Sequence, residues 1–113
     1  MATKIAVVGA GYWGPNIIRN FTQIPNSEMA VCCDLDEKRL AHMSRLYPSV
    51  RTTTNYDEII NDSTIDAVAV CTHVSAHYPL AMKALQAGKH VLIEKPMTAK
   101  VEEAEELVET AKK

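Results

Sequence analysis

Residues 4–14, with the sequence KIAVVGAGYWG, decide the fold, because an apolar run passes there directly into a glycine-rich turn. The apolar part predicts a buried strand, and the periodicity of residues 13–23 predicts a helix after the turn. Gly9 permits a tight turn, Gly11 lets the backbone approach a pyrophosphate, and Gly14 lets helix and strand pack closely. The free N–H groups of the helix start attract phosphate charge. The stretch therefore predicts a dinucleotide-binding unit.

The rest of the chain alternates short apolar runs with segments of helical periodicity. Most of the runs are continuously apolar, which is typical of strands covered on both faces in a parallel sheet. This order predicts a doubly wound α/β fold, a Rossmann-like sheet of about five strands joined by right-handed crossovers. The predicted strands are 4–8, 29–34, 51–53, 67–71 and 90–94, and the helices are 13–23, 36–47, 55–61, 75–87 and one after Thr98.

Polar residues at the helix starts predict their N-caps. Asn55, with Glu58 three residues later, has the spacing of a capping box. In the last helix, Val101, Ala104, Leu107, Val108 and Ala111 are predicted to form one buried stripe. The predicted N-caps are Asp36, Asn55, Ser75 and Thr98, and Gly88 is predicted to follow the end of the fourth helix.

The composition is that of one globular domain and excludes several functions. The chain has 113 residues, 12 Lys and Arg against 14 Asp and Glu, and 5% aromatic residues. A nucleic-acid partner is not expected, because backbone binding needs a basic face and base stacking needs aromatic side chains. No run approaches the roughly 20 apolar residues of a membrane span, and the start shows no cleavable leader. We therefore expect a cytoplasmic protein.

The cysteines and histidines do not predict a metal site. Cys32, Cys33 and Cys71 lie in apolar runs without the spacing of a zinc or redox pair, so we interpret them as reduced core thiols. Cys71 with His73 and His77 would still lack a fourth ligand.

Asp34 strengthens the dinucleotide interpretation. It lies 20 residues after Gly14 at the end of the second strand, where an acid accepts hydrogen bonds from the adenosine ribose hydroxyls. Its carboxylate would repel the 2′-phosphate of NADP, so NAD is predicted over NADP. Lys38 and Arg39, which are nearby, are interpreted as solvated charges. A methyltransferase that binds S-adenosylmethionine uses a similar turn and acid, and is the rival interpretation at this point.

Two later segments favour an oxidoreductase. Thr72 ends the fourth strand region and His77 starts the next helix, so both could border the cofactor crevice, although His77 could also simply pack under its helix. The predicted fifth strand ends in Glu94, Lys95 and Pro96. Charged side chains at the end of a buried strand need an explanation, such as a role in the site. The alternative is that Lys95 has no functional role and only forms an ion pair with Glu94 or another surface carboxylate.

The glycine turn, Asp34, residues 72–77 and residues 88–96 together resemble the glucose-fructose oxidoreductase, inositol dehydrogenase and rhizopine catabolism (Gfo/Idh/MocA) family. The resemblance covers essentially the whole chain. In that family the Glu-Lys-Pro signature lies beside the nicotinamide and its lysine positions substrate and cofactor, which implies a catalytic role for Lys95. His73 and Val74 stand where the family usually has Pro and Asn.

The resemblance also implies a domain organisation. Family members join a nucleotide domain to an α/β substrate domain that binds a sugar or other polyol and holds the catalytic Asp and His. Residues 1–113 correspond to the nucleotide domain alone, with the sixth strand and the substrate domain absent. The parent protein is then expected to be a homo-oligomer that transfers a hydride between nicotinamide and a sugar, polyol or sugar-nucleotide hydroxyl. The chain alone is expected to be inactive, and the alternative is an NAD-binding sensor without a reaction.

The predicted site combines the motif residues with those implied by the resemblance. Tyr12 and Trp13 are included as residues of the glycine turn, although either could be a packing residue. Lys95 is the predicted catalytic residue, and the predicted cofactor-binding residues are Gly9, Gly11, Tyr12, Trp13, Gly14, Asp34, Thr72, His77, Glu94, Lys95 and Pro96.

Overall fold

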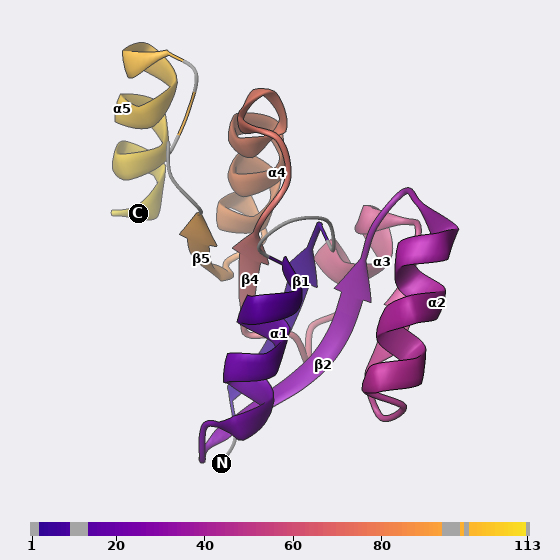
Figure 1. The fold of residues 1–113 in the computed structure, drawn as a ribbon. Helices are drawn as coiled ribbons and strands as arrows, with labels where there is room; N and C mark the ends of the chain where they lie inside the picture. The colour runs from indigo at the N-terminus through magenta and orange to yellow at the C-terminus, as the bar shows by residue number, and fades with distance from the viewer. Residues whose placement is uncertain (1–2, 10–13, 94–97, 99, 113) are drawn as a thin grey trace.

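Parallel strands and helices alternate along the chain in the computed structural model, which describes residues 3–9, 14–93, 98 and 100–112 (Figure 1). Five strands form one parallel sheet in the order β3-β2-β1-β4-β5. This confirms the predicted doubly wound, Rossmann-like α/β sheet. The strands are β1 Thr3–Val8, β2 Ser27–Cys33, β3 Arg51–Thr53, β4 Ala67–Val70 and β5 His90–Ile93, and the helices are α1 Gly14–Gln23, α2 Glu37–Leu46, α3 Tyr56–Ile60, α4 Val74–Gln86 and α5 Val101–Ala111.

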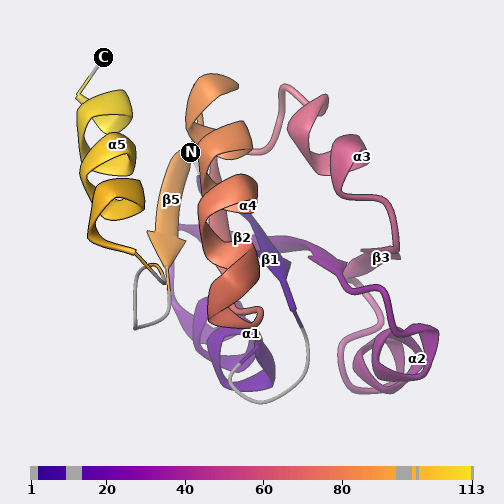
Figure 2. The same ribbon diagram turned by 90° about the horizontal axis from the view of Figure 1, so that it is seen from above.

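Helices cover both faces of the sheet (Figure 2). On one face Ile18 of α1 and Met43 of α2 pack against strand residues such as Val7. On the other face Ile59 of α3 and Ala84 of α4 pack against the alternate strand residues. Because neighbouring residues of a strand point to opposite faces, a strand covered on both sides must be apolar throughout.

The register of the sheet brings three chain segments to one edge. Val8 at the end of β1 lies beside Cys33 of β2 and Val70 of β4. The residues that follow these strands therefore emerge together at the carboxyl edge. Ligands of open parallel sheets bind at this edge.

Two of the predicted N-caps are confirmed. The Asp36 carboxylate accepts a hydrogen bond from the backbone N–H of Lys38 at 2.9 Å. The Asn55 side chain accepts one from the backbone N–H of Asp57 at 3.0 Å.

The reciprocal half of the capping box is wrong. The backbone N–H of Asn55 donates to the Thr53 hydroxyl oxygen at 3.0 Å, and that hydroxyl donates to the Glu58 carboxylate. Thr53 thus stands between the two groups that a capping box would join directly.

The other two N-cap predictions are wrong. Helix α4 begins at Val74, one residue before the predicted start, with His73 as its N-cap and no capping hydrogen bond from that side chain. Helix α5 begins at Val101 after the N-cap Lys100, and the Thr98 hydroxyl donates to the Lys100 carbonyl oxygen at 2.6 Å instead. In both places the short polar side chain lies close to the helix start but off its cap position. Gly88, with a φ of 80°, does follow the end of α4.

The buried stripe predicted for the last helix is narrower than expected. Leu107 is buried, whereas Val101 is 70% exposed and Val108 is 45% exposed. Helix α5 packs against α4 through the Leu107 side, and among the described residues no other element covers the two valines. Within the described ranges β5 is also an edge strand, and Leu92 on it is half exposed. No helix in the part of the chain that the structure describes is long and apolar enough to cross a membrane.

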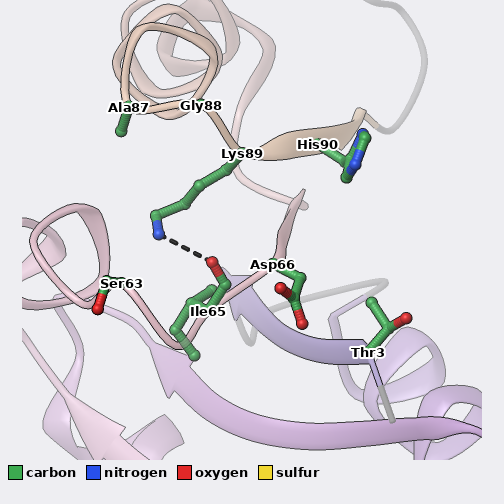
Figure 3. A pocket seen from close by; sticks show the side chains of 8 residues that line it. All are labelled: Thr3, Ser63, Ile65, Asp66, Ala87, Gly88, Lys89 and His90. Carbon is green, nitrogen blue, oxygen red and sulfur yellow. Dashed lines mark hydrogen bonds between the residues drawn. The ribbon is translucent and has the colours of Figure 1, made fainter. Parts of the chain in front are cut away.

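Lys89 joins two connections at the amino edge of the sheet. Its side chain is only 7% exposed, and its ammonium donates to the carbonyl oxygens of Asp62 at 2.8 Å and Ile65 at 2.9 Å. Figure 3 shows the bond to Ile65. The buried charge is thus compensated by backbone carbonyls of the segment that leads into β4.

The substitution Lys89→Met tests this role, because it keeps the apolar stem but removes the donors. Two carbonyl groups lose their partner, so we expect the free energy of unfolding to fall by about 1–3 kcal/mol. Urea denaturation followed by circular dichroism measures the change. Lys83→Met is the matched control, since Lys83 forms an exposed pair with Asp57 at 3.2 Å and its loss should cost less than about 1 kcal/mol. Equal losses in the two variants would contradict the assignment.

Candidate functional site

The carboxyl edge is built around a close contact between two glycines. Gly9 follows β1 with a φ of 98°, which L side chains rarely adopt, and its N–H donates to the Cys33 carbonyl oxygen at 2.7 Å. A Cβ atom added to Gly14, the first residue of α1, would lie 1.8 Å from the Gly9 carbonyl oxygen. Gly14 therefore has the close-packing role that its position in the motif predicts.

This contact places the start of α1 at the sheet edge. The first N–H groups of a helix have no partner inside the helix and carry partial positive charge, so they suit a phosphate group. Six predicted site residues, Gly11, Tyr12, Trp13, Glu94, Lys95 and Pro96, lie outside the described residues, and their contacts stay predictions.

Asp34 lies directly after β2 with a side chain that is 9% exposed. Its backbone N–H donates to the Thr53 carbonyl oxygen at 3.2 Å, and its Oδ1 accepts from the backbone N–H of Asp36 at 2.8 Å. These bonds fix the carboxylate at the carboxyl edge. A carboxylate has about four acceptor positions, so it can also accept hydrogen bonds from a bound diol.

Arg39 lies closer to this carboxylate than its interpretation as a solvated charge implied. Its Nη1 is 3.9 Å from the Asp34 Oδ2, and its Nε is 3.7 Å from the Asp36 Oδ2. The side chain is still 53% exposed. The signal that could have found this contact is the spacing of three residues from Asp36 in the first turn of α2.

Thr72 and His77 come together on the other side of β1. The Thr72 hydroxyl donates to the His73 carbonyl oxygen at 3.3 Å, and the His77 Nε2 lies 2.9 Å from the Thr72 carbonyl oxygen. A Cβ atom added to Gly9 would lie 2.7 Å from the Cys71 carbonyl oxygen and 3.0 Å from the Thr72 nitrogen. The structure thus brings Thr72 against the glycine turn, whereas the His77 side chain is buried beneath it.

The cysteines are buried thiols. Burial, followed by the nearby Asp34 carboxylate, raises the pKa of Cys32 to about 12 and that of Cys33 to about 11. Neither of them forms a disulfide, and Cys71 is half-buried. Among the described residues no group of three or more His, Cys, Asp or Glu side chains could hold a metal ion.

A hollow lies at the amino edge of the sheet, opposite the glycine turn (Figure 3). It is lined by residues at the starts of strands, such as Thr3 and His90, together with Lys89. Asp66 on its wall already accepts a hydrogen bond from the backbone N–H of Lys4 at 2.8 Å. Because the hollow lies at the starts of the strands and Gly9 follows the end of β1, the hollow is separate from the glycine turn.

The glycine turn, the helix that starts on it and the acid after the second strand define a dinucleotide-binding domain of the Rossmann type. A family model described as "Oxidoreductase family, NAD-binding Rossmann fold" matches residues 3–113. The chain belongs to this family, Gfo/Idh/MocA, and corresponds to its NAD-binding domain.

Similar proteins show how much of a relative the chain spans. Inositol 2-dehydrogenase 2 of Paenarthrobacter aurescens (strain TC1) is 38% identical over 109 residues, which are 96% of this chain and 32% of the relative. The chain thus spans about a third of this relative, and between 19% and 31% of other curated relatives that it matches.

Solved structures share the fold closely. GenD2 from gentamicin A biosynthesis, solved with NAD, has a TM-score of 0.93 and 31% identity over 98% of this chain and 32% of its own. Biliverdin reductase from Synechocystis sp. PCC 6803, solved with biliverdin and NADP+, has a TM-score of 0.92 and 28% identity over 97% of this chain and 34% of its own.

The substitution Gly14→Ala tests the glycine contact. Its Cβ would overlap the Gly9 carbonyl, so we expect a loss of about 3 kcal/mol or more in the free energy of unfolding. Gly88→Ala is the control, because a Cβ at Gly88 meets no atom within 4 Å and only its positive φ is strained, at about 1–2 kcal/mol. Thermal and urea unfolding measure both, and a Gly14→Ala loss no larger than that of Gly88→Ala would refute the contact.

The buried thiols predict a pH dependence. At pH 8 Cys32 and Cys33 stay protonated in the folded chain, so iodoacetamide should modify them slowly until the protein is unfolded. A thiol whose folded pKa is raised above the unfolded value near 9 stabilises the fold below pH 9. This stabilisation is lost as the pH rises through 11 and 12. Mass spectrometry of the alkylated protein reads out each site, and rapid modification of the native chain at pH 8 would contradict the assignment.

Proposed function

We propose that the chain is the nucleotide-binding domain of an NAD-dependent oxidoreductase that transfers a hydride between nicotinamide and a hydroxyl of a sugar, polyol or sugar nucleotide. The observation that carries the proposal is the position of Asp34 at the carboxyl edge beside the glycine turn. A carboxylate held there by backbone hydrogen bonds suits the two hydroxyls of an adenosine ribose.

The described residues fit an NAD molecule. Bound NAD would supply the hydride-accepting nicotinamide ring, and this chain's own groups would hold and orient the dinucleotide. The helix start at Gly14 would bind the pyrophosphate, Asp34 would accept from the ribose hydroxyls, and Thr72 would border the crevice beside Gly9. Each of these groups is fixed by backbone contacts before any ligand arrives, which lowers the ordering cost of binding.

The electrostatics of the ribose end favour NAD over NADP. The Asp34 carboxylate would lie next to a 2′-phosphate and repel it. The Arg39 guanidinium, which could attract the phosphate, is shared between the Asp34 and Asp36 carboxylates at 3.9 and 3.7 Å. The carboxylates of Asp34 and Asp36 carry two negative charges against the one positive charge of Arg39, so the local net charge is unfavourable for a phosphate.

The chemistry itself would need groups beyond the described residues. By resemblance Lys95, with Glu94 and Pro96, would lie beside the nicotinamide and position the substrate, and a following α/β domain would supply the acid–base residues. The relatives are about three times as long as this chain, and one is an inositol 2-dehydrogenase, which supports a polyol or sugar substrate. We therefore expect residues 1–113 to bind cofactor without turning over substrate.

Two features of the chain support a cytoplasmic location and self-association of the protein. Reduced thiols at Cys32, Cys33 and Cys71 suit the cytoplasm, where disulfides are rare. The half-exposed Leu92 on the edge strand β5 supports self-association, because edge strands pair readily with a further chain.

Calorimetric titration of the chain with NAD, NADP and S-adenosylmethionine tests the proposal. We expect saturable NAD binding, weaker NADP binding and no binding of S-adenosylmethionine. Asp34→Ala should weaken NAD binding about 10- to 100-fold, because hydrogen bonds to a charged group contribute about 1.5–3 kcal/mol. It should also narrow the preference for NAD over NADP. Asp57→Ala is the control, since Asp57 is an exposed acid of α3 that pairs with Lys83.

Two outcomes would overturn the proposal. Binding of S-adenosylmethionine in place of NAD would identify a methyltransferase-like nucleotide site. An Asp34→Ala affinity equal to that of Asp57→Ala would remove Asp34 from the site.

A further inference from the structure

His77 is a polar side chain in the core of the domain. It lies in the first turns of α4 and is 1% exposed, and the other buried residues of that helix are Ala81 and Ala84. A buried imidazole requires hydrogen-bond partners to offset its desolvation. An apolar side chain could be buried here without such partners, so the imidazole indicates that its hydrogen bond has a role.

The hydrogen bond of His77 has a fixed direction. Its Nε2 lies 2.9 Å from the Thr72 carbonyl oxygen, and a carbonyl can only accept. Nε2 therefore carries the hydrogen and donates it. The bond reaches back from the helix to the last residue before the N-cap His73, which makes no capping hydrogen bond with its own side chain.

The Thr72 carbonyl belongs to the segment that packs against the glycine turn. The Cys71 N–H donates to the Val8 carbonyl oxygen at 2.8 Å, and a Cβ at Gly9 would come within 2.7 Å of the Cys71 carbonyl oxygen and 3.0 Å of the Thr72 nitrogen. The Cys71–Thr72 peptide thus rests on Gly9. His77 binds the carbonyl of the next peptide, Thr72–His73.

We propose that His77 is a positioning residue for the cofactor site, which fixes the Thr72 carbonyl and through it the contact between residues 71–72 and Gly9. Its burial gives the ring no open surface for a cofactor, so it acts through Thr72. The inference rests on the proposed function, because the turn that it holds is the one to which the dinucleotide would bind. The sequence predicted that His77 contacts the cofactor directly. In this proposal His77 instead supports Thr72, which borders the crevice, from within the core.

Three variants separate positioning from simple packing. His77→Gln places an amide nitrogen near the position of Nε2 and keeps the donor, whereas His77→Leu keeps a buried side chain of similar size without a donor. Ile59→Val is the control for stability, because Ile59 of α3 is fully buried and its apolar side chain takes no part in the bond between His77 and Thr72. Melting temperature, the dissociation constant for NAD and the amide NMR shifts of Gly9 and Thr72 are measured for each.

We expect His77→Leu to weaken NAD binding about tenfold and to shift the Gly9 and Thr72 amide signals. His77→Gln should restore NAD affinity to within about twofold of the unsubstituted chain, and Ile59→Val should lower the melting temperature without changing either NMR signal. Long-range ¹⁵N spectra of the unsubstituted chain should show the hydrogen on Nε2 of His77. These spectra also decide the matter if His77→Leu fails to fold.

Several results would overturn the inference. The hydrogen on Nδ1 alone would exclude the donated bond. A loss of NAD affinity in His77→Leu that His77→Gln does not restore would assign the effect to packing. If the unsubstituted chain does not bind NAD, the proposed function fails, while unchanged Gly9 and Thr72 signals in His77→Leu would separately refute the positioning role.

Discussion

The backbone contact between Gly14 and the Gly9 carbonyl sets the geometry on which the carboxyl edge depends. A side-chain carbon at Gly14 would lie 1.8 Å from that oxygen, so the first turn of α1 comes closer to the strand end than any other residue type allows. The contact turns the chain from β1 into α1 within a few residues. It thereby aims the positive end of the helix dipole at the same edge at which Asp34 and Thr72 emerge.

Backbone hydrogen bonds extend the order of the sheet beyond the ends of its strands. Gly9 donates to Cys33, Asp34 donates to Thr53, and Cys71 donates to Val8, each across neighbouring strands. The residues that follow three strands are therefore held by main-chain groups. In the proposed NAD site the Asp34 carboxylate, rather than a loop of variable shape, would distinguish ligands, and the rigidity of this arrangement is the kind of pre-organisation that binding sites need.

The sequence predicted the features that depend on spacing and residue type. The glycine spacing, the acid 20 residues later and the continuously apolar runs indicated the Rossmann-like sheet, and the right-handed crossovers limited the strand order. Strand 51–53 and the caps Asp36 and Asn55 were found because their signals are local.

The features that the sequence did not predict depend on competition between nearby groups or on distant partners. Ser75 and Thr98 are good capping residues, yet α4 starts two residues before, and α5 two residues after, the positions that those caps require. Helical periodicity marked the apolar side of α5 but not how much of it a neighbour covers, so Val101 and Val108 were placed inside. The bond from His77 to the Thr72 carbonyl could not be derived either, because a backbone acceptor leaves no residue type to recognise.

The buried Lys89 gives the domain a second fixed point at the far edge of the sheet. It ties the entry to β4 to the entry to β5 by bonds to the Asp62 and Ile65 carbonyls, whereas the glycine turn lies at the other end of the same strands. Lys89 thus adds to the stability of the fold at the end of the sheet opposite the glycine turn. Exposed positions between these carbonyls, such as Ser63, are accordingly suitable for attaching a fluorophore or a surface tether, which would leave the glycine turn open to its ligand.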